Sequence, residues 1–178
     1  MAADKVLLVF CASSYEIDPV FNEVAREVVR AASLKGYDIA SGGTVKGTMG
    51  VVADEAERCG VGNIGVIPHF MQDVLYPRLT RVVWTDTMSE RKEKMREVGS
   101  AAAVALPGGI GTMDELFETY TLAKLGKYNG RVIAFNYKGF YDGLKHMLDH
   151  FVETKMLDER TRNLIFFPET AQELSDLL

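Results

Sequence analysis

The fold of this chain is decided by the stretch Ala101-Ala-Ala-Val-Ala-Leu-Pro-Gly-Gly-Ile-Gly-Thr-Met-Asp-Glu115. Residues 101–106 form an uninterrupted apolar run, which is typical of a strand buried on both faces of a parallel sheet. Pro107 has no backbone N–H and ends the pairing. The glycines that follow can adopt positive φ and let a ligand approach the main chain closely. The stretch therefore predicts a buried strand, a glycine-rich turn and then a helix.

The start of that helix favours an anion. Thr112 suits a cap or first-turn position, and the unpaired N–H groups and dipole of a helix N-terminus attract negative charge. Asp114 and Glu115 are expected in the first turn. One interpretation is a phosphate cradle with a carboxylate close by. The alternative is an ordinary turn followed by acids that only interact with the helix dipole.

A second glycine-rich segment has the same character. Ser41-Gly-Gly-Thr-Val-Lys-Gly-Thr-Met-Gly50 follows a short strand at 37–40 and opens a helix at about 51–59. Both turns would lie at the carboxyl edge of a parallel sheet, where open α/β sheets bind ligands. One site built from two loops is the simplest prediction.

The rest of the chain alternates strand-like and helical patterns. Apolar strand-like runs occur at about 5–10, 37–40, 63–67, 80–84, 101–106, 131–135 and 163–167. A helix at about 18–34 has apolar residues at helical spacing, and Gly36 stands where it would end. The alternation predicts a Rossmann-like, doubly wound, mainly parallel sheet with helices on both faces. Because no linker or repeat interrupts it, we expect a single domain over residues 1–178.

Three segments carry a more specific pattern: Gly42-Gly-Thr-Val-Lys-Gly-Thr-Met-Gly50, Arg91-Lys-Glu-Lys-Met95 and Pro107-Gly-Gly-Ile-Gly-Thr-Met-Asp-Glu115. Together they resemble the LOG (Lonely guy) family, the cytokinin riboside 5′-monophosphate phosphoribohydrolases. The resemblance extends over nearly the whole chain, from Cys11 to Leu144. It implies an AMP-like nucleotide as partner and a homodimer with the helical region 117–125 near its interface.

The resemblance also implies roles for individual residues. Glu115, the last glutamate of the PGGxGTxxE motif, and Arg91 of the RK pair would be catalytic. The 5′-phosphate would be held by the turn residues Gly108, Gly109, Gly111 and Thr112. The nucleotide would further be lined by Ser13, Gly42, Gly43, Thr44 and Lys92. Met88, near Met95 and Met113 in sequence, is assigned to packing on the base, the alternative being a place in the core.

Two positions depart from the family pattern. The family has glycine where this chain has Ala12, and histidine where it has Ser89. Alanine restricts the backbone of the first loop. The loss of the histidine would remove a polar group from the base side of the site, so we expect it to affect the choice of base more than the type of reaction.

Glycosidic cleavage needs residues of these types. An oxocarbenium-like sugar needs a carboxylate that stabilises the cation or activates water, which suits Glu115. A departing base and a phosphate both favour a guanidinium, which suits Arg91. A solvated, charged helix face over residues 86–98 is the alternative. We predict hydrolysis of AMP or an N6-substituted analogue to free base and ribose 5-phosphate, without metal or organic cofactor. The rivals are a nucleotide-binding or carrier protein without chemistry and an enzyme for another phosphosugar.

Composition excludes several classes of protein. The 178 residues are 47% hydrophobic and 25% charged with a net charge of −5, so no basic surface indicates nucleic acid. The apolar run Val6–Phe10 is too short for a signal peptide or a membrane span, which makes the cytoplasm the expected location. Cys11 and Cys59 lack the spacing of a disulfide framework or zinc site, and we expect reduced thiols.

Other ligand classes lack their signatures. The first strand ends in Cys11-Ala-Ser-Ser-Tyr15, without the glycines of a dinucleotide-binding turn. His146 and His150 are four residues apart but lack the glutamate of the zinc-hydrolase motif, and we expect them at the surface. His69 follows a strand-like run and is expected in a loop, the alternative being a place at the border of the pocket. No lysine is marked as a Schiff-base partner for pyridoxal phosphate.

Overall fold

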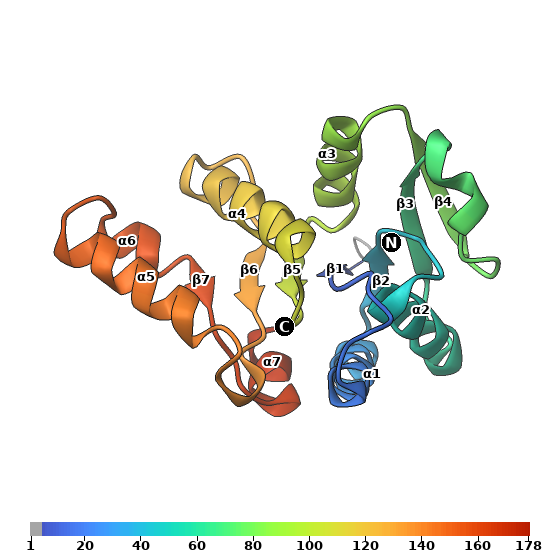
Figure 1. Ribbon diagram of the computed structural model, residues 1–178, viewed down its shortest axis with the longest axis horizontal. Coiled ribbons are helices and arrows are strands. Elements are labelled where there is room, and N and C mark those ends of the chain that lie inside the picture. Colours follow the sequence, from blue (N-terminus) through green and yellow to red (C-terminus); the bar gives the residue numbers. More distant parts are fainter. Residues whose placement is uncertain (1–4) are drawn as a thin grey trace.

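Seven parallel strands form one sheet with helices on both faces (Figure 1). The computed structural model describes residues 5–178. The strands are β1 (Val6–Phe10), β2 (Asp38–Ser41), β3 (Asn63–Pro68), β4 (Arg81–Thr85), β5 (Ala102–Ala105), β6 (Arg131–Ala134) and β7 (Ile165–Phe166). The α-helices are α1 (Pro19–Leu34), α2 (Gly47–Cys59), α3 (Met88–Val98), α4 (Ile110–Lys124), α5 (Asp142–Glu153), α6 (Glu159–Arg162) and α7 (Ala171–Leu177). Two 3₁₀ helices, η1 (His69–Val74) and η2 (Tyr137–Gly139), complete the elements.

The predicted fold class is confirmed. The strand order is β4-β3-β2-β1-β5-β6-β7, and every pair of neighbours is parallel. Each of the seven strand-like runs in the sequence forms a strand. The prediction of a mainly parallel sheet left room for an antiparallel strand, but every strand within residues 5–178 pairs in parallel.

The central strands are buried on both faces, which explains their continuous apolar sequences. In β1, Leu8 and Phe10 belong to the core under α3, α4 and α5, while Leu7 and Val9 belong to the core under α1, α2 and α7. Both leucines are fully buried. Burying a side chain of this size contributes roughly 1.5–3 kcal/mol, so the two cores hold the helices firmly against the sheet.

Helix α1 follows the predicted signals closely. Its N-cap Asp18 accepts a hydrogen bond from the Val20 N–H, and Pro19 occupies the first helical position. Lys35 is the C-cap, and Gly36 turns the chain with a φ of 77°. The predicted helix at 18–34 is therefore confirmed.

Residues 5–178 contain neither a membrane-spanning helix nor a disulfide bond. No helix in residues 5–178 has the length and apolar composition needed to cross a membrane. Both Cys11 and Cys59 are free thiols, as predicted. The N-terminal Met1–Asp4, which precede the apolar run Val6–Phe10, lie outside the described residues.

Candidate functional site

A cleft opens beside β1 at the carboxyl edge of the sheet. The strand order reverses here, because β2, β3 and β4 follow on one side of β1 and β5, β6 and β7 on the other. Loops that leave neighbouring strands diverge at such a switch point, and α/β sheets bind ligands there. The cleft has a volume of about 370 Å³ and is lined by the loops after β1, β2 and β5 together with α2, η1, α3 and α4.

Most residues predicted for the site line this cleft. They are Ser13, Gly42, Thr44, Met88, Arg91, Lys92, Gly109, Gly111, Thr112 and Glu115. Gly43 and Gly108 do not line it and instead allow close packing behind it. A Cβ at Gly43 would lie 2.8 Å from the Cα of Gly65, and one at Gly108 would lie 2.2 Å from Thr112 Oγ1.

The N-terminus of α4 forms one end of the cleft. Gly109 is the N-cap, Thr112 lies in the first turn, and no side chain caps the helix. A Cβ on Gly109 or Gly111 would meet no atom within 4 Å, so the main chain lies open to a ligand. The free N–H groups and the helix dipole favour an anion at this point. These glycines do not have positive φ, so the conformational reason predicted for them was wrong: what matters is the missing side chain.

Asp114 and Glu115 do not lie in the first turn of α4. The helix begins at Ile110, two residues before Thr112, and its first turn contains no acid. The predicted position was wrong because glycines gave no clear sign of where the helix starts. The interpretation of these acids as partners of the helix dipole fails with it, since the dipole acts mainly within the first turn.

Arg91 is held in the cleft wall by the backbone. Only 6% of the residue is exposed. Its Nε donates a hydrogen bond of 2.9 Å to the Val66 carbonyl, and its Nη2 donates one of 3.2 Å to the Gly42 carbonyl. Most of α3 is at least partly exposed, but the alternative of a solvated face is wrong for Arg91 itself.

Glu115 faces Arg91 without a close hydrogen bond. Arg91 Nη1 lies 3.7 Å from Glu115 Oε1, and the Glu115 side chain is 14% exposed. Burial raises the pKa of Glu115 to about 7, because loss of water outweighs the attraction of Arg91, and the neighbouring charge of Asp114 adds to the rise. Glu115 therefore changes between acid and carboxylate near neutral pH.

Lys92 joins α3 to α4. Its Nζ lies 3.0 Å from Asp114 Oδ2 and 2.5 Å from Glu118 Oε2. The hydrogen bond to Glu118 is the main reason that the pKa of Lys92 is raised. Arg96 adds a contact of 2.9 Å to the same glutamate. Lys92 lines the cleft, but its charge is already balanced by two carboxylates.

The second glycine-rich segment forms the opposite wall. Helix α2 begins at Gly47, four residues before the predicted start at 51, so the end of the segment is the first helical turn. The Thr48 N–H donates a 3.0 Å hydrogen bond to the Ala12 carbonyl. A Cβ on Gly47 would lie 2.6 Å from the carbonyl carbon of Ser13. Glycine therefore lets this turn pack directly on the loop after β1.

Neither departure from the family pattern disturbs the cleft. In residues 5–178 the non-glycine residues with positive φ are Lys138 and Lys155, so Ala12 is unstrained. The expected restriction at Ala12 has no structural consequence. Ser89 is exposed and lies in a separate depression between α3 and α4, so its side chain does not line the cleft. The expected effect of the missing histidine on the choice of base stays a prediction.

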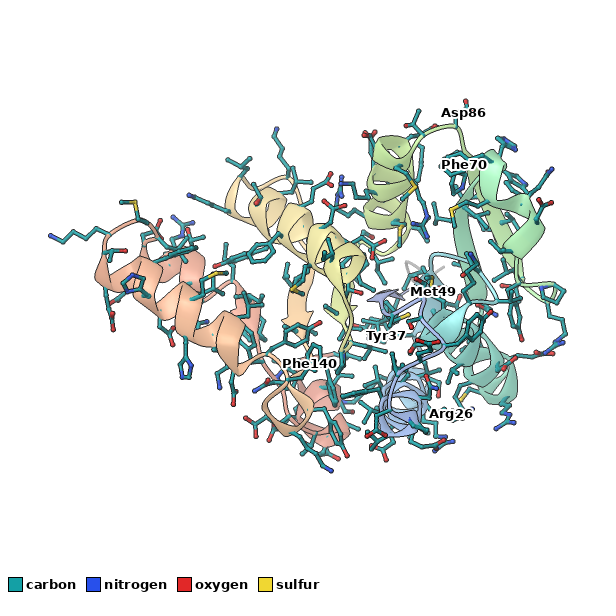
Figure 2. All side chains as sticks on the ribbon, viewed as in Figure 1. Arg26, Tyr37, Met49, Phe70, Asp86 and Phe140 are labelled. Carbon is teal, nitrogen blue, oxygen red and sulfur yellow. The ribbon has the colours of Figure 1, made fainter. Side chains whose placement is uncertain are left out.

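Methionines form the apolar part of the wall. The cleft is lined by Met49 from α2, Met71 from η1, and Met88 and Met95 from α3. Figure 2 shows Met49 in the space between α2, α3 and the start of α4. Met113 packs instead against the core. Thioether side chains are flexible and polarisable, so they can pack on a flat aromatic ligand.

Sequence reasoning missed several residues of the cleft. They are Val9, Cys11, Ala12, Ser14, Lys46, Met49, Met71, Met95, Ile110 and Asp114. Most of them are close in sequence to the predicted site residues, so their position beside a motif could have identified them. Met71 had no such signal, because it comes from the unpredicted helix η1.

None of the histidines lines the cleft. His69 belongs to η1 rather than to an irregular loop and stacks on Trp84 with ring centroids 4.9 Å apart. His146 and His150 are exposed on α5, as predicted. Within residues 5–178, no three His, Cys, Asp or Glu residues form a group that could hold a metal ion.

Solved structures similar to this one share its fold. A molybdenum cofactor binding protein from Rippkaea orientalis superposes with a TM-score of 0.73 at 16% identity, covering 99% of this chain and 96% of that one. The molybdenum cofactor carrier protein of Chlamydomonas reinhardtii gives a TM-score of 0.72 at 17% identity, covering 98% and 95%. At these identities the likeness concerns the fold alone.

Sequence relatives are more specific. A probable cytokinin riboside 5′-monophosphate phosphoribohydrolase of Oryza sativa subsp. japonica is 34% identical over 98% of this chain and 83% of its own length. A cytokinin riboside 5′-monophosphate phosphoribohydrolase of Mycobacterium tuberculosis is 34% identical over 86% of this chain and 82% of its own length. The family model described as "Possible lysine decarboxylase" matches residues 49–178. With its paired glycine turns, its buried Arg91 and Glu115, and these relatives, the chain belongs to the LOG family.

Proposed function

We propose that this protein is a nucleoside 5′-monophosphate phosphoribohydrolase. It cleaves the N-glycosidic bond of AMP, or of an AMP analogue substituted at N6, and releases the free base and ribose 5-phosphate. The observation that carries the proposal is the buried Glu115, which faces Arg91 in the same cleft as the open N-terminus of α4. The names of the sequence relatives support the same reaction.

The positions of the residues suggest how the substrate lies. The phosphate accepts hydrogen bonds from the first turn of α4, at Gly109, Gly111 and Thr112, where the main chain is uncapped. The base packs on the methionine wall. Between these two ends, the ribose places its anomeric carbon near Glu115. We assign each part of the substrate by its chemistry: the anionic phosphate suits the helix N-terminus, and the flat base suits the apolar wall.

The reaction is a hydrolysis in which water is the only co-reactant. The bond between the anomeric carbon and the base nitrogen breaks, and both bonding electrons leave with the base. Water oxygen then bonds to the anomeric carbon, and the water proton balances the charge on the base. As a carboxylate, Glu115 stabilises the cationic sugar or accepts the water proton. A pKa of about 7 suits proton transfer at neutral pH.

Arg91 complements the carboxylate. Its guanidinium is fixed by the carbonyls of Val66 and Gly42, so its position does not depend on the substrate. A fixed positive charge stabilises the negative charge that develops on the departing base or resides on the phosphate, without reorganisation during the reaction. We therefore assign Arg91 and Glu115 as the catalytic pair.

Base release from AMP tests the proposal directly. Purified protein is incubated with AMP and with N6-isopentenyl-AMP, and the products are separated by chromatography. We expect free base and ribose 5-phosphate in equal amounts. We expect Glu115→Gln to lose turnover but retain AMP binding, because the phosphate contacts are mainly to the backbone. Glu27→Gln is the matched control, since Glu27 is exposed on α1 and does not line the cleft.

Two results would contradict the proposal. Folded protein that releases no base from either nucleotide is not a phosphoribohydrolase for these substrates. Tight AMP binding in calorimetry with the nucleotide recovered intact would instead establish a nucleotide-binding or carrier protein. A fully active Glu115→Gln variant would leave the reaction in place but remove Glu115 from it.

The proposal extends to the assembly and its location. We propose a single nucleotide-binding domain that acts in the cytoplasm as a homodimer. Exposed apolar side chains at both ends of α4 support the dimer: Ile110 at its start is 89% exposed, and Leu125, its C-cap, is 61% exposed. Phe117 lines a shallow groove on α4 between them. Large apolar side chains exposed next to one another often mark a surface that a partner covers.

A further inference from the structure

Three cations line the cleft, and two of them are already engaged. Arg91 faces Glu115 and donates to two backbone carbonyls. Lys92 is paired with Asp114 and Glu118. Lys46 also lines the cleft, and no carboxylate of residues 5–178 lies within 4.0 Å of its ammonium group. Of these three cations, Lys46 is therefore the one without a carboxylate partner among residues 5–178.

The backbone at Lys46 is fixed, while its side chain is not. Its N–H lies 3.3 Å from Thr44 Oγ1, and its carbonyl accepts hydrogen bonds from the N–H groups of Met49 and Gly50. The next residue, Gly47, packs on the loop that contains Ser13. The Lys46 side chain makes no capping hydrogen bond to α2. The structure thus positions the Cα of Lys46 at the cleft and leaves the ammonium group available.

We infer that Lys46 binds the phosphate of the substrate. The inference rests on the proposed function, which brings a phosphate dianion into this cleft. A phosphate dianion adds negative charge to a chain whose net charge is already −5. Arg91 faces Glu115, and Lys92 is paired with Asp114 and Glu118, so Lys46 adds a positive charge that no carboxylate of residues 5–178 balances. Backbone N–H groups of α4 give direction to the phosphate, and Lys46 gives the ion pair.

This role predicts an effect that depends on the phosphate. Removing the ammonium group weakens the binding of AMP, ribose 5-phosphate and inorganic phosphate, because each contains the phosphate that Lys46 contacts. Adenosine has no phosphate and is affected little. Since the inference assigns Lys46 to the phosphate and not to the bond that breaks, we expect KM for AMP to rise more than kcat falls. A charge-assisted hydrogen bond of ordinary strength corresponds to a loss of roughly tenfold or more in affinity.

The experiment compares Lys46→Met, Lys46→Arg and Lys35→Met. Lys35 is exposed at the far end of α1 and makes no ion pair with residues 5–178, so its replacement gives the same change of charge away from the cleft. KM and kcat are measured with AMP, inhibition with ribose 5-phosphate, and Kd for AMP and adenosine by calorimetry. We expect Lys46→Met to raise KM for AMP and weaken inhibition by ribose 5-phosphate roughly tenfold, Lys46→Arg to retain most of the affinity, and Lys35→Met to behave as the unmodified protein.

The outcomes separate this inference from the proposed function. If the unmodified protein cleaves AMP but Lys46→Met has the same KM, Lys46 does not bind the phosphate. Equal losses for AMP and adenosine in calorimetry would likewise overturn the inference, because they would indicate a general effect on the cleft. If the unmodified protein binds AMP without cleaving it, the proposed reaction fails, yet a loss specific to AMP in Lys46→Met would still support the inference.

Discussion

Glutamine in place of Glu115 is expected to stabilise the folded protein at alkaline pH and to change its stability little at acidic pH. Burial raises the pKa of Glu115 from the ordinary value of 4.5 to about 7, so the folded protein prefers the neutral acid. The contribution of Glu115 to stability is fully present below pH 4.5 and is lost as pH rises through 7. Glutamine resembles the neutral acid in shape and does not ionise.

The size of the effect follows from the shift of the pKa. Each pKa unit corresponds to about 1.4 kcal/mol, so ionising Glu115 in the folded state costs about 3 kcal/mol once the pH is well above 7. At pH 5, where Glu115 is mostly protonated in the folded protein, the same relation gives a loss of stability of less than about 1 kcal/mol. Arg91 stays charged throughout this range, and its attraction for ionised Glu115 is already contained in the raised pKa of Glu115, so it adds no separate pH-dependent difference.

The assay is urea unfolding of both proteins between pH 5 and pH 9 without ligand. We expect the difference in free energy of unfolding to grow by roughly 2–3 kcal/mol over this range, which corresponds to roughly 4–12 °C in Tm for a chain of this size. Glu27→Gln should show no such growth. A constant difference between the Glu115→Gln and unmodified proteins would mean that Glu115 titrates normally, and the reasoning from burial would be refuted.

Three further changes have defined outcomes. The rate of base release should rise with pH through about 7, because Glu115 acts as a carboxylate and burial raises its pKa to that value; a flat profile from pH 5.5 to 8.5 would exclude this role. Gly42→Ala would place a Cβ 2.1 Å from Arg91 Nη2, and we expect roughly a 100-fold loss of kcat/KM because Arg91 would be displaced. The control Gly143→Ala meets no atom within 4 Å and should be fully active. Equal activities of the two variants would show that the position of Arg91 is not critical. Leu125→Glu should convert the proposed dimer into a monomer in light scattering, and an unchanged mass would place the interface elsewhere.

The parallel sheet could be predicted because its information is local. Strands such as 101–106 are buried on both faces and are apolar throughout, and helix 18–34 carries its own start and stop signals. Helix boundaries within glycine-rich segments could not be predicted. Helices α2 and α4 begin at Gly47 and Ile110 without side-chain caps, so the usual residues that mark a helix start are missing.

The proposed catalytic pair, Arg91 and Glu115, illustrates a second limit of prediction from sequence. Residues 86–98 look like a solvated helix in sequence, and the burial of Arg91 depends on the carbonyl of Gly42 in the loop after β2 and that of Val66 in β3. The same is true of the raised pKa of Glu115, which results from burial and from the distance to Arg91. Motif resemblance identified these residues, whereas their environment is a property of the tertiary structure.

A crystal structure of the Glu115→Gln variant with AMP tests the central claim most directly. The account predicts the phosphate at the first turn of α4, the base on the methionine wall, and the side chain at 115 facing the anomeric carbon across from Arg91. A phosphate bound away from Gly109–Thr112, or a side chain at 115 directed away from the ribose in every copy, would contradict it.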